Sequence, residues 1–252
     1  MQLLPEMLSI FDAGFLVISS FFTSLLTAAA GIGGGVTLLA IMAQIMPVAA
    51  IVPVHGIVQL GSNVGRAGLM RSFVDRKLLL YFAGGSLVGA FVGGQLVVTL
   101  PVAYLQLTLA VFILYATWGP KLSGLSSVHS GLAIGGGLST LLTMFVGATG
   151  PFVAAILKPF RLGRHAQVAT MSACMVVQHS LKVLVFGLLG FSFAPYLPLM
   201  AVMIAVGFIG TIVGGKLLHK LSEHLFKILL NSLLTVLALR LLWIAAEPLL
   251  AG

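Results

Sequence analysis

Charged residues are scarce in this chain, and their scarcity excludes an ordinary soluble domain. Only 7% of the 252 residues are Asp, Glu, Lys or Arg, and 60% are hydrophobic. A soluble domain carries about 25% charged residues. Acidic residues are fewer than basic ones, with five Asp and Glu against thirteen Lys and Arg. Neither paired carboxylates nor a nucleophile beside a base is visible, so we expect no catalytic residues and no enzyme.

Cysteine is almost absent. Cys174 is the single cysteine, so neither an internal disulfide nor a cysteine metal site can form. The six histidines lack the spacing of metal ligands on one helix face, and we expect no metal and no cofactor. The net charge is +8. The basic residues lie between apolar runs and do not form a basic patch with aromatic residues, so the expected partner is a lipid bilayer and not nucleic acid.

Long apolar runs fill the chain instead. A membrane-spanning helix needs about 20 apolar residues. Eight such segments cover residues 8–46, 47–67, 78–98, 102–119, 129–158, 165–187, 196–217 and 226–246. They leave no room for a soluble domain, so we expect an all-α polytopic membrane protein that forms a single transmembrane domain over residues 1–252.

Glycines interrupt two of these segments, and the interruption repeats. Residues 24–34 align with residues 140–150 at an offset of 116, with five of eleven positions identical. Residues 89–96 match residues 210–217 at five of eight positions, at an offset of 121. Matches in the same order predict two four-segment repeats, about 8–119 and 129–246. The alternative is chance similarity between apolar sequences.

Basic residues then restrict the topology. They fall between segments two and three, four and five, five and six, and seven and eight: Arg66, Arg71, Arg76, Lys77, Lys121, Lys158, Arg161, Arg164, Lys216, Lys220 and Lys227. The positive-inside rule puts all four regions in the cytoplasm, which eight simple crossings cannot achieve.

The conflict disappears if each broken segment enters and leaves on one side. Each half then has a re-entrant hairpin and three crossings, the second half is inverted, and both termini lie outside. Inverted repeats with broken helices are typical of secondary transporters, whose sites lie at the breaks near the midplane. The alternative is a kinked but fully crossing first segment, with looser obedience to the rule.

Three motifs carry a family resemblance: Gly31–Val36 after an apolar helix, the small and polar helix Val54–Gly68, and the glycine pattern Gly84–Gly94. Together they resemble the sulfite exporter TauE/SafE family, and the resemblance extends over essentially the whole chain. It implies a multi-pass permease of the bacterial inner membrane. It also implies a substrate among sulfite, sulfonates and other sulfur-containing anions.

The broken segments supply the first candidate site residues. Glycine tips let the free N–H groups at the start of a half-helix point into a cavity, where they bind an anion without a charged side chain. The candidates are Gly33, Gly34, Gly35, Thr149 and Gly150. Pro151 suits the first turn of the returning half-helix. The alternative is close helix packing, which we expect for Gly89, Gly93, Gly94, Gly210, Gly214 and Gly215.

Two polar helices supply the remaining candidates: His55, Gln59, Ser62, Asn63 and Arg66 in one, and Gln178, His179 and Lys182 in the other. At the offset of 116, Ser62 pairs with Gln178, Asn63 with His179 and Arg66 with Lys182. Polar groups inside a membrane are costly unless they face protein or water. The alternatives are a cytoplasmic anchor for Arg66, a snorkelling side chain for Lys182, and histidines bonded to backbone carbonyls instead of proton carriers.

The sequence therefore predicts a secondary transporter for a small anion, sulfite or an organosulfur anion, that works by alternating access, with protons as a candidate coupling ion. The alternatives are a passive anion channel and a membrane subunit of a larger transport assembly.

Overall fold

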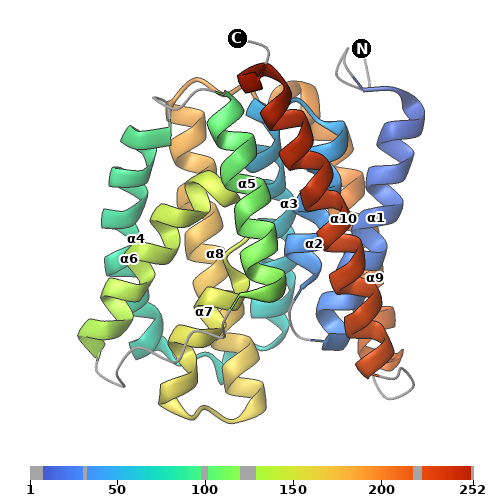
Figure 1. The fold of residues 1–252 in the computed structure, drawn as a ribbon. Coiled ribbons are helices and arrows are strands. Elements are labelled where there is room, and N and C mark those ends of the chain that lie inside the picture. Colours follow the sequence, from blue (N-terminus) through green and yellow to red (C-terminus); the bar gives the residue numbers. More distant parts are fainter. Residues whose placement is uncertain (1–7, 31–32, 98–101, 120–128, 218–222, 251–252) are drawn as a thin grey trace. The chain divides into compact units, whose positions relative to one another are not determined.

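The structure is a computed structural model that describes residues 8–30, 33–97, 102–119, 129–217 and 223–250. Within these ranges the chain is all-α (Figure 1). The helices are α1 (Ile10–Ala30), α2 (Gly34–Ile45), α3 (Val48–Leu69), α4 (Arg76–Val97), α5 (Val102–Trp118), α6 (His129–Val146), α7 (Gly150–Leu157), α8 (Arg164–Leu188), α9 (Leu197–Leu217) and α10 (Glu223–Leu250). Short 3₁₀ helices are η1 (Arg71–Phe73), η2 (Lys158–Phe160) and η3 (Ala194–Tyr196).

The helices confirm a polytopic α-helical membrane protein. Six of the described helices, α1, α3, α4, α6, α8 and α9, are long and apolar enough to cross a membrane. Shorter apolar stretches lie in α2, α5, α7 and α10. The two segments that glycine interrupts in the sequence are the pairs α1–α2 and α6–α7, so both predicted breaks are present as helix ends.

Two acids form helix caps, which explains where these helices begin. At α1, Ser9 and Asp12 cap each other's backbone N–H groups, at 3.1 and 3.2 Å, in the reciprocal arrangement of a capping box. At α4, Asp75 Oδ1 accepts a hydrogen bond of 3.0 Å from the N–H of Leu78. Pro151 lies in the first turn of α7, as predicted, because proline has no N–H to leave unbonded there.

The helices belong to two compact units. The first unit comprises residues 1–55, 100–120 and 195–252, and the second comprises residues 56–99 and 121–194. Helix α3 therefore contributes its start to the first unit and the rest to the second. Each unit combines helices from both sequence repeats.

In the first unit, α1 lies along α9, and α10 lies along α5 (Figure 1). The short helix α2 contacts α1 and α10. Gly210 and Gly214 of α9 lie so close to the backbone of α1 that a Cβ on either would collide with the carbonyl of Phe21 or Leu25. Buried Ser20 adds a hydrogen bond of 2.8 Å from its hydroxyl to the carbonyl of Met203.

In the second unit, α4 contacts both α6 and α8, and α7 contacts the same two helices. A Cβ on Gly89 of α4 would collide with the carbonyl of Gly137, and one on Gly93 would lie 3.2 Å from the Cα of Leu141. A Cβ on Gly94 would lie 2.7 Å from Val185 Cγ1. The predicted packing role is thus confirmed for these three glycines.

The two helix contacts are related by the sequence repeat. Gly137 and Leu141 follow Phe21 and Leu25 by 116 residues, and Gly210 and Gly214 follow Gly89 and Gly93 by 121. Gly210 and Gly214 therefore also have the predicted packing role, whereas the contacts of Gly215 lie outside the described ones. The same pair of small-residue helix contacts is built once in each unit.

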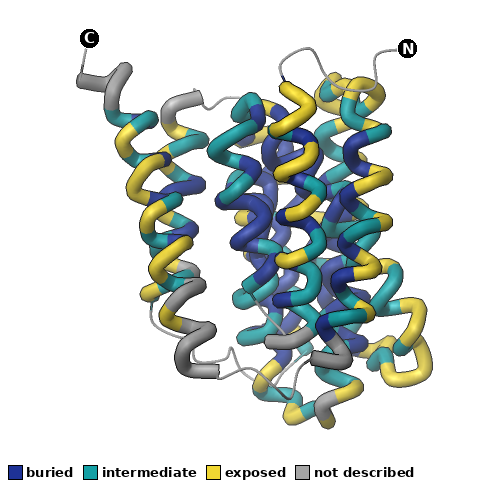
Figure 2. The backbone as a smooth tube through the Cα atoms, turned by 90° about the vertical axis from the view of Figure 1, so that its right-hand side faces the viewer, coloured by how far each residue is buried: buried dark blue, intermediate teal, exposed yellow. Residues whose placement is uncertain are grey.

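The outer faces of the helices are apolar. On α4, Leu80, Leu87 and Phe91 are exposed, whereas Phe82 and Gly89 are buried. Figure 2 shows the same division along single helices, with exposed residues in yellow and buried ones in dark blue. Large exposed apolar side chains on membrane helices are expected to face lipid.

Basic loops gather at one end of the second unit. The ring of Phe73, at the end of η1, lies 5.3 Å from that of His165 at the start of α8. The ring of His129, the first residue of α6, lies 4.6 Å from Tyr81 and 6.2 Å from Phe160 in η2. Helices α6 and α7 therefore begin and end at the same end of the unit.

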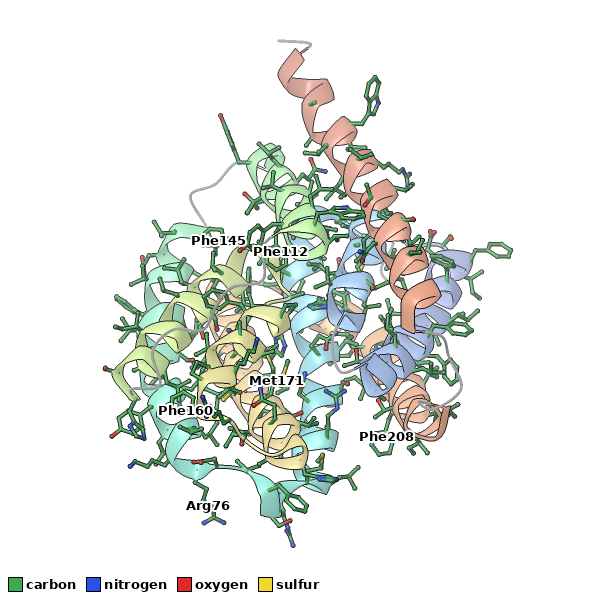
Figure 3. All side chains as sticks on the ribbon, turned by 60° about the horizontal axis from the view of Figure 1, so that its bottom comes forward. Arg76, Phe112, Phe145, Phe160, Met171 and Phe208 are labelled. Carbon is green, nitrogen blue, oxygen red and sulfur yellow. The ribbon has the colours of Figure 1, made fainter. Side chains whose placement is uncertain are left out.

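Several basic residues that the topology argument used lie in these segments, among them Arg71, Arg76, Lys158 and Arg161. Figure 3 shows Arg76 projecting away from the helices there. Of the other residues in that argument, Lys121 and Lys220 lie outside the described residues.

Candidate functional site

Each broken segment turns at glycine. Helix α1 ends at Ala30 and α2 begins at Gly34, with Gly33 at a φ of 103°. Helix α6 ends at Val146 and α7 begins at Gly150, with Gly147 at a φ of 74°. These positive φ values favour glycine because a Cβ would clash with the backbone. Gly34 and Gly150 are 116 residues apart, so the two breaks occupy the same place in the repeat.

At the first break, Gly34 packs tightly against α1. Gly34 is buried, and a Cβ on it would collide with the carbonyl of Thr23 and the hydroxyl of Thr27 in α1. The hydroxyl of Thr37 donates a hydrogen bond of 2.9 Å to the carbonyl of Gly33. The backbone of α1 therefore fills the space where a side chain at position 34 would lie, and anion binding by the N–H groups of this tip stays a prediction.

His55 joins α3 to the first break. Its Nε2 donates a hydrogen bond of 2.9 Å to the carbonyl of Gly35, and its side chain is buried. The alternative of a histidine bonded to a backbone carbonyl is thus the arrangement present at this position. A proton-carrying role for His55 stays a prediction.

The second break has a buried polar cluster around it. Thr149 Oγ1 donates a hydrogen bond of 2.7 Å to Gln178 Oε1. Gln178 Nε2 donates to Ser139 Oγ at 2.6 Å and to Thr140 Oγ1 at 3.3 Å. All four side chains are buried. One amide of α8 thus connects α6 to the turn that precedes α7.

Lys182 lies one helical turn beyond Gln178 and is fully buried. Its Nζ donates a hydrogen bond of 2.9 Å to the carbonyl of Gly147, inside the break. Its aliphatic chain lies against Gly56, where an added Cβ would be 2.8 Å from Lys182 Cε. Lys182 therefore does not snorkel to the headgroups, because its ammonium is held inside the unit.

No carboxylate compensates this buried ammonium within the second unit. Its only acid in the sequence is Asp75, whose backbone N–H donates to Thr170 Oγ1 at 2.9 Å. Thr170 precedes Lys182 by twelve residues on α8, which corresponds to about 18 Å along the helix. A buried, unpaired cation costs several kcal/mol, so Lys182 is expected to have a functional reason for its position.

The remaining predicted residues do not join this cluster. Asn63 Nδ2 donates to the carbonyl of Gln59 at 2.8 Å, within α3. Ser62 and Arg66 are only partly buried, although Arg66 Nη2 is buried and bonds no described residue. His179 is fully buried next to Gln178 in the sequence. The structure thus brings together Thr149, Gln178 and Lys182, whereas the described hydrogen bonds of the α3 residues do not reach them.

Two hydroxyls of α6, those of Ser139 and Thr140, belong to the cluster but were not predicted as site residues. Thr143 follows Ser139 by one helical turn, and its carbonyl accepts a hydrogen bond of 3.0 Å from the N–H of Gly147. Thr143 is fully buried, and its hydroxyl has no hydrogen-bond partner among the described residues. Their signal was present in the repeat, where Thr140-Leu-Leu-Thr143 aligns with Ser24-Leu-Leu-Thr27. Hydroxyls on a membrane helix often bond their own backbone, so the pattern alone did not distinguish a site.

Comparison with known proteins adds a family. The sequence matches the family model described as Sulfite exporter TauE/SafE over residues 16–241, a range that contains both breaks and the Gln178 cluster. No curated protein and no solved structure matches the chain.

Proposed function

Because the chain belongs to the sulfite exporter TauE/SafE family, we propose that it moves a small anion, sulfite or an organosulfur anion, across a membrane as a secondary transporter. Family membership and six candidate spans make it a multi-pass membrane transporter and not an enzyme. The proposed location is a bacterial inner membrane.

The observation that carries an anionic substrate is the buried ammonium of Lys182 at a helix break. A cation without a carboxylate in its own unit attracts an anion that enters the site. Helix α7 begins at Gly150, so its first N–H groups have no acceptor within the helix and add a partial positive charge. We place the substrate beside Lys182, Gln178, Thr149 and Gly150, with His179 nearby on α8.

Two findings support an inverted repeat with re-entrant hairpins. Helices α6 and α7 begin and end at one end of the second unit, beside the basic loops. The equivalent packing glycines of α4 and α9 support a repeated four-segment plan. In this proposal both termini lie outside, and one half moves against the other during transport. Reporter fusions at each terminus test the topology, and a cytoplasmic C-terminus would contradict it.

Anion flux into proteoliposomes tests the function. The panel contains sulfite, methanesulfonate, sulfate and chloride, each measured with and without a pH gradient. A transporter gives saturable flux with counterflow, and coupling to protons makes the pH gradient drive accumulation. Flux that rises linearly with concentration and shows no counterflow would indicate a channel, and absence of any anion flux would contradict the proposal.

A further inference from the structure

The second break differs from the first in its unused hydrogen-bond donors. Ser139, Thr140, Thr143 and Thr149 offer one hydroxyl proton each, Gln178 offers two and Lys182 three, which makes nine. The four hydrogen bonds described above use four of them. Five donor protons in these buried side chains have no acceptor among the described residues, and this number is the same for either orientation of the Gln178 amide.

Two of the corresponding hydroxyls of the first unit have no such surplus, and the third, that of Ser24, belongs to a side chain that is only partly buried. Thr23 and Thr27 precede Ser139 and Thr143 by 116 residues. Thr23 donates to the carbonyl of Ser19 at 2.8 Å, and Thr27 donates to that of Thr23 at 2.9 Å. These donors are satisfied inside α1, so they are not available to a ligand.

Buried donors without acceptors are costly, and a surplus concentrated at one place indicates a ligand that supplies acceptors. On α6, Ser139 and Thr143 are four residues apart, which puts them on one face of the helix. Thr140 lies between them, three residues before Thr143. Lys182 contributes the positive charge, and the only acid of the unit is distant. The fitting ligand therefore has several acceptor oxygens and a negative charge.

We infer that the anion binds only at the second break, as an oxyanion of the sulfonate or hydrogensulfite type whose oxygens accept from Thr143, its α6 neighbours and Lys182. This inference rests on the proposed function and narrows its site. The first break is a fixed structural turn. Thr143 is a ligand of the anion, and the ammonium of Lys182 turns from the Gly147 carbonyl to the substrate.

The test compares Thr143→Val with Thr27→Val in the full-length protein in detergent. The probe is methanesulfonate, which stays a monoanion at every pH used, and the readouts are calorimetric affinity and thermal midpoint. Thr143→Val should weaken binding about tenfold, since it removes one hydrogen bond to a charged group. Its ligand-free midpoint should stay equal or rise, because a buried hydroxyl without a partner has been removed.

Thr27→Val is the matched control at the equivalent position of the first break. It should lower the ligand-free midpoint and leave the affinity for methanesulfonate unchanged. Thr143→Ser, which keeps the hydroxyl, should restore binding to within about twofold of the parent.

The outcomes separate the two levels of the proposal. Parent protein that neither binds nor transports any anion of the panel overturns the proposed function. Parent protein that binds methanesulfonate while Thr143→Val binds equally well, or while Thr27→Val weakens binding as much, overturns only this inference. Stabilisation by chloride equal to that by methanesulfonate contradicts a ligand with several oxygens.

Discussion

The two helix breaks start from aligned glycines but have opposite surroundings. At the first break, the backbone of α1 fills the space beside Gly34. At the second, the nearest atom to a Cβ added on Gly150 would be Met171 Cε, at 3.7 Å, which is an ordinary contact. Met171 follows His55 by 116 residues, and Figure 3 labels it on α8. His55, which donates a hydrogen bond to the first break, thus corresponds at the second break to Met171, a flexible side chain without a strong hydrogen-bond donor.

The difference shows that an internal repeat duplicates a backbone shape and not a site. Both breaks interrupt a helix, yet only the second has a fully buried cation among its described side chains. The first break has its threonine hydroxyls bonded to backbone carbonyls. The first break is therefore suited to a structural role, and the second is suited to binding a ligand.

The largest expected effect comes from Lys182→Met, which removes the buried charge of the second break. Anion affinity and transport should fall about a hundredfold, because the substrate loses its charged donor. The protein should stay folded, since methionine keeps much of the aliphatic contact with Gly56. The measurement is flux in proteoliposomes, together with the thermal midpoint.

Arg240→Met is the control, because Arg240 is an exposed cation of the first unit. Its flux should match that of the parent protein. Equal flux from Lys182→Met and the parent would mean that the buried ammonium is structural only.

The next effect comes from the glycines that begin α2 and α7. Gly34→Ala should destabilise the protein by about 1–3 kcal/mol, because its methyl group meets backbone that cannot rotate away. Gly150→Ala should be tolerated, because the nearest described atom to the new methyl group is at van der Waals distance. Monodisperse yield and thermal midpoint in detergent check both variants. Similar losses in the two would remove the distinction between a packed and an open break.

The smallest effect is expected for His55→Met. This variant places a methionine at position 55, as at the aligned position of the second repeat, Met171. Loss of the bond to the Gly35 carbonyl should lower the free energy of unfolding by about 1 kcal/mol. Transport and its response to a pH gradient should remain if His55 is structural. The control is Met171→Leu. If His55→Met abolishes only the pH-driven component of flux, His55 carries protons and the first break is functional as well.

Much of the fold could be predicted because its signals are local in the sequence. Apolar runs of sufficient length predict spans, and the interruptions at residues 31–35 and 147–151 predict the broken segments. The packing glycines of α4 and α9 could be recognised because small residues recur at four-residue spacing, as close helix contacts require. Of the site, Thr149, Gln178 and Lys182 were predicted, and the structure brings them to one break.

The rest of the site depends on groups that are distant in the sequence. Gln178 bonds Ser139 and Thr140 across 39 and 38 residues, and no local pattern reveals such partners. Ser139, Thr140 and Thr143 were missed because a helix hydroxyl can bond its own backbone or another group, and only packing decides which. The close packing of Gly34 could not be predicted, because glycine runs look the same whether backbone or open space lies opposite.

The sequence by itself determined that this protein is a helical membrane protein with two glycine breaks, since hydrocarbon admits only helices of a given length with internally satisfied backbone. Only the tertiary structure decided that the breaks differ. Packing sets the distance from Gly34 to the carbonyl of Thr23, and it sets which hydroxyls remain near Lys182 without acceptors. These distances depend on how α1, α6 and α8 meet their neighbours, and hydrogen bonds and steric contacts change over fractions of an ångström.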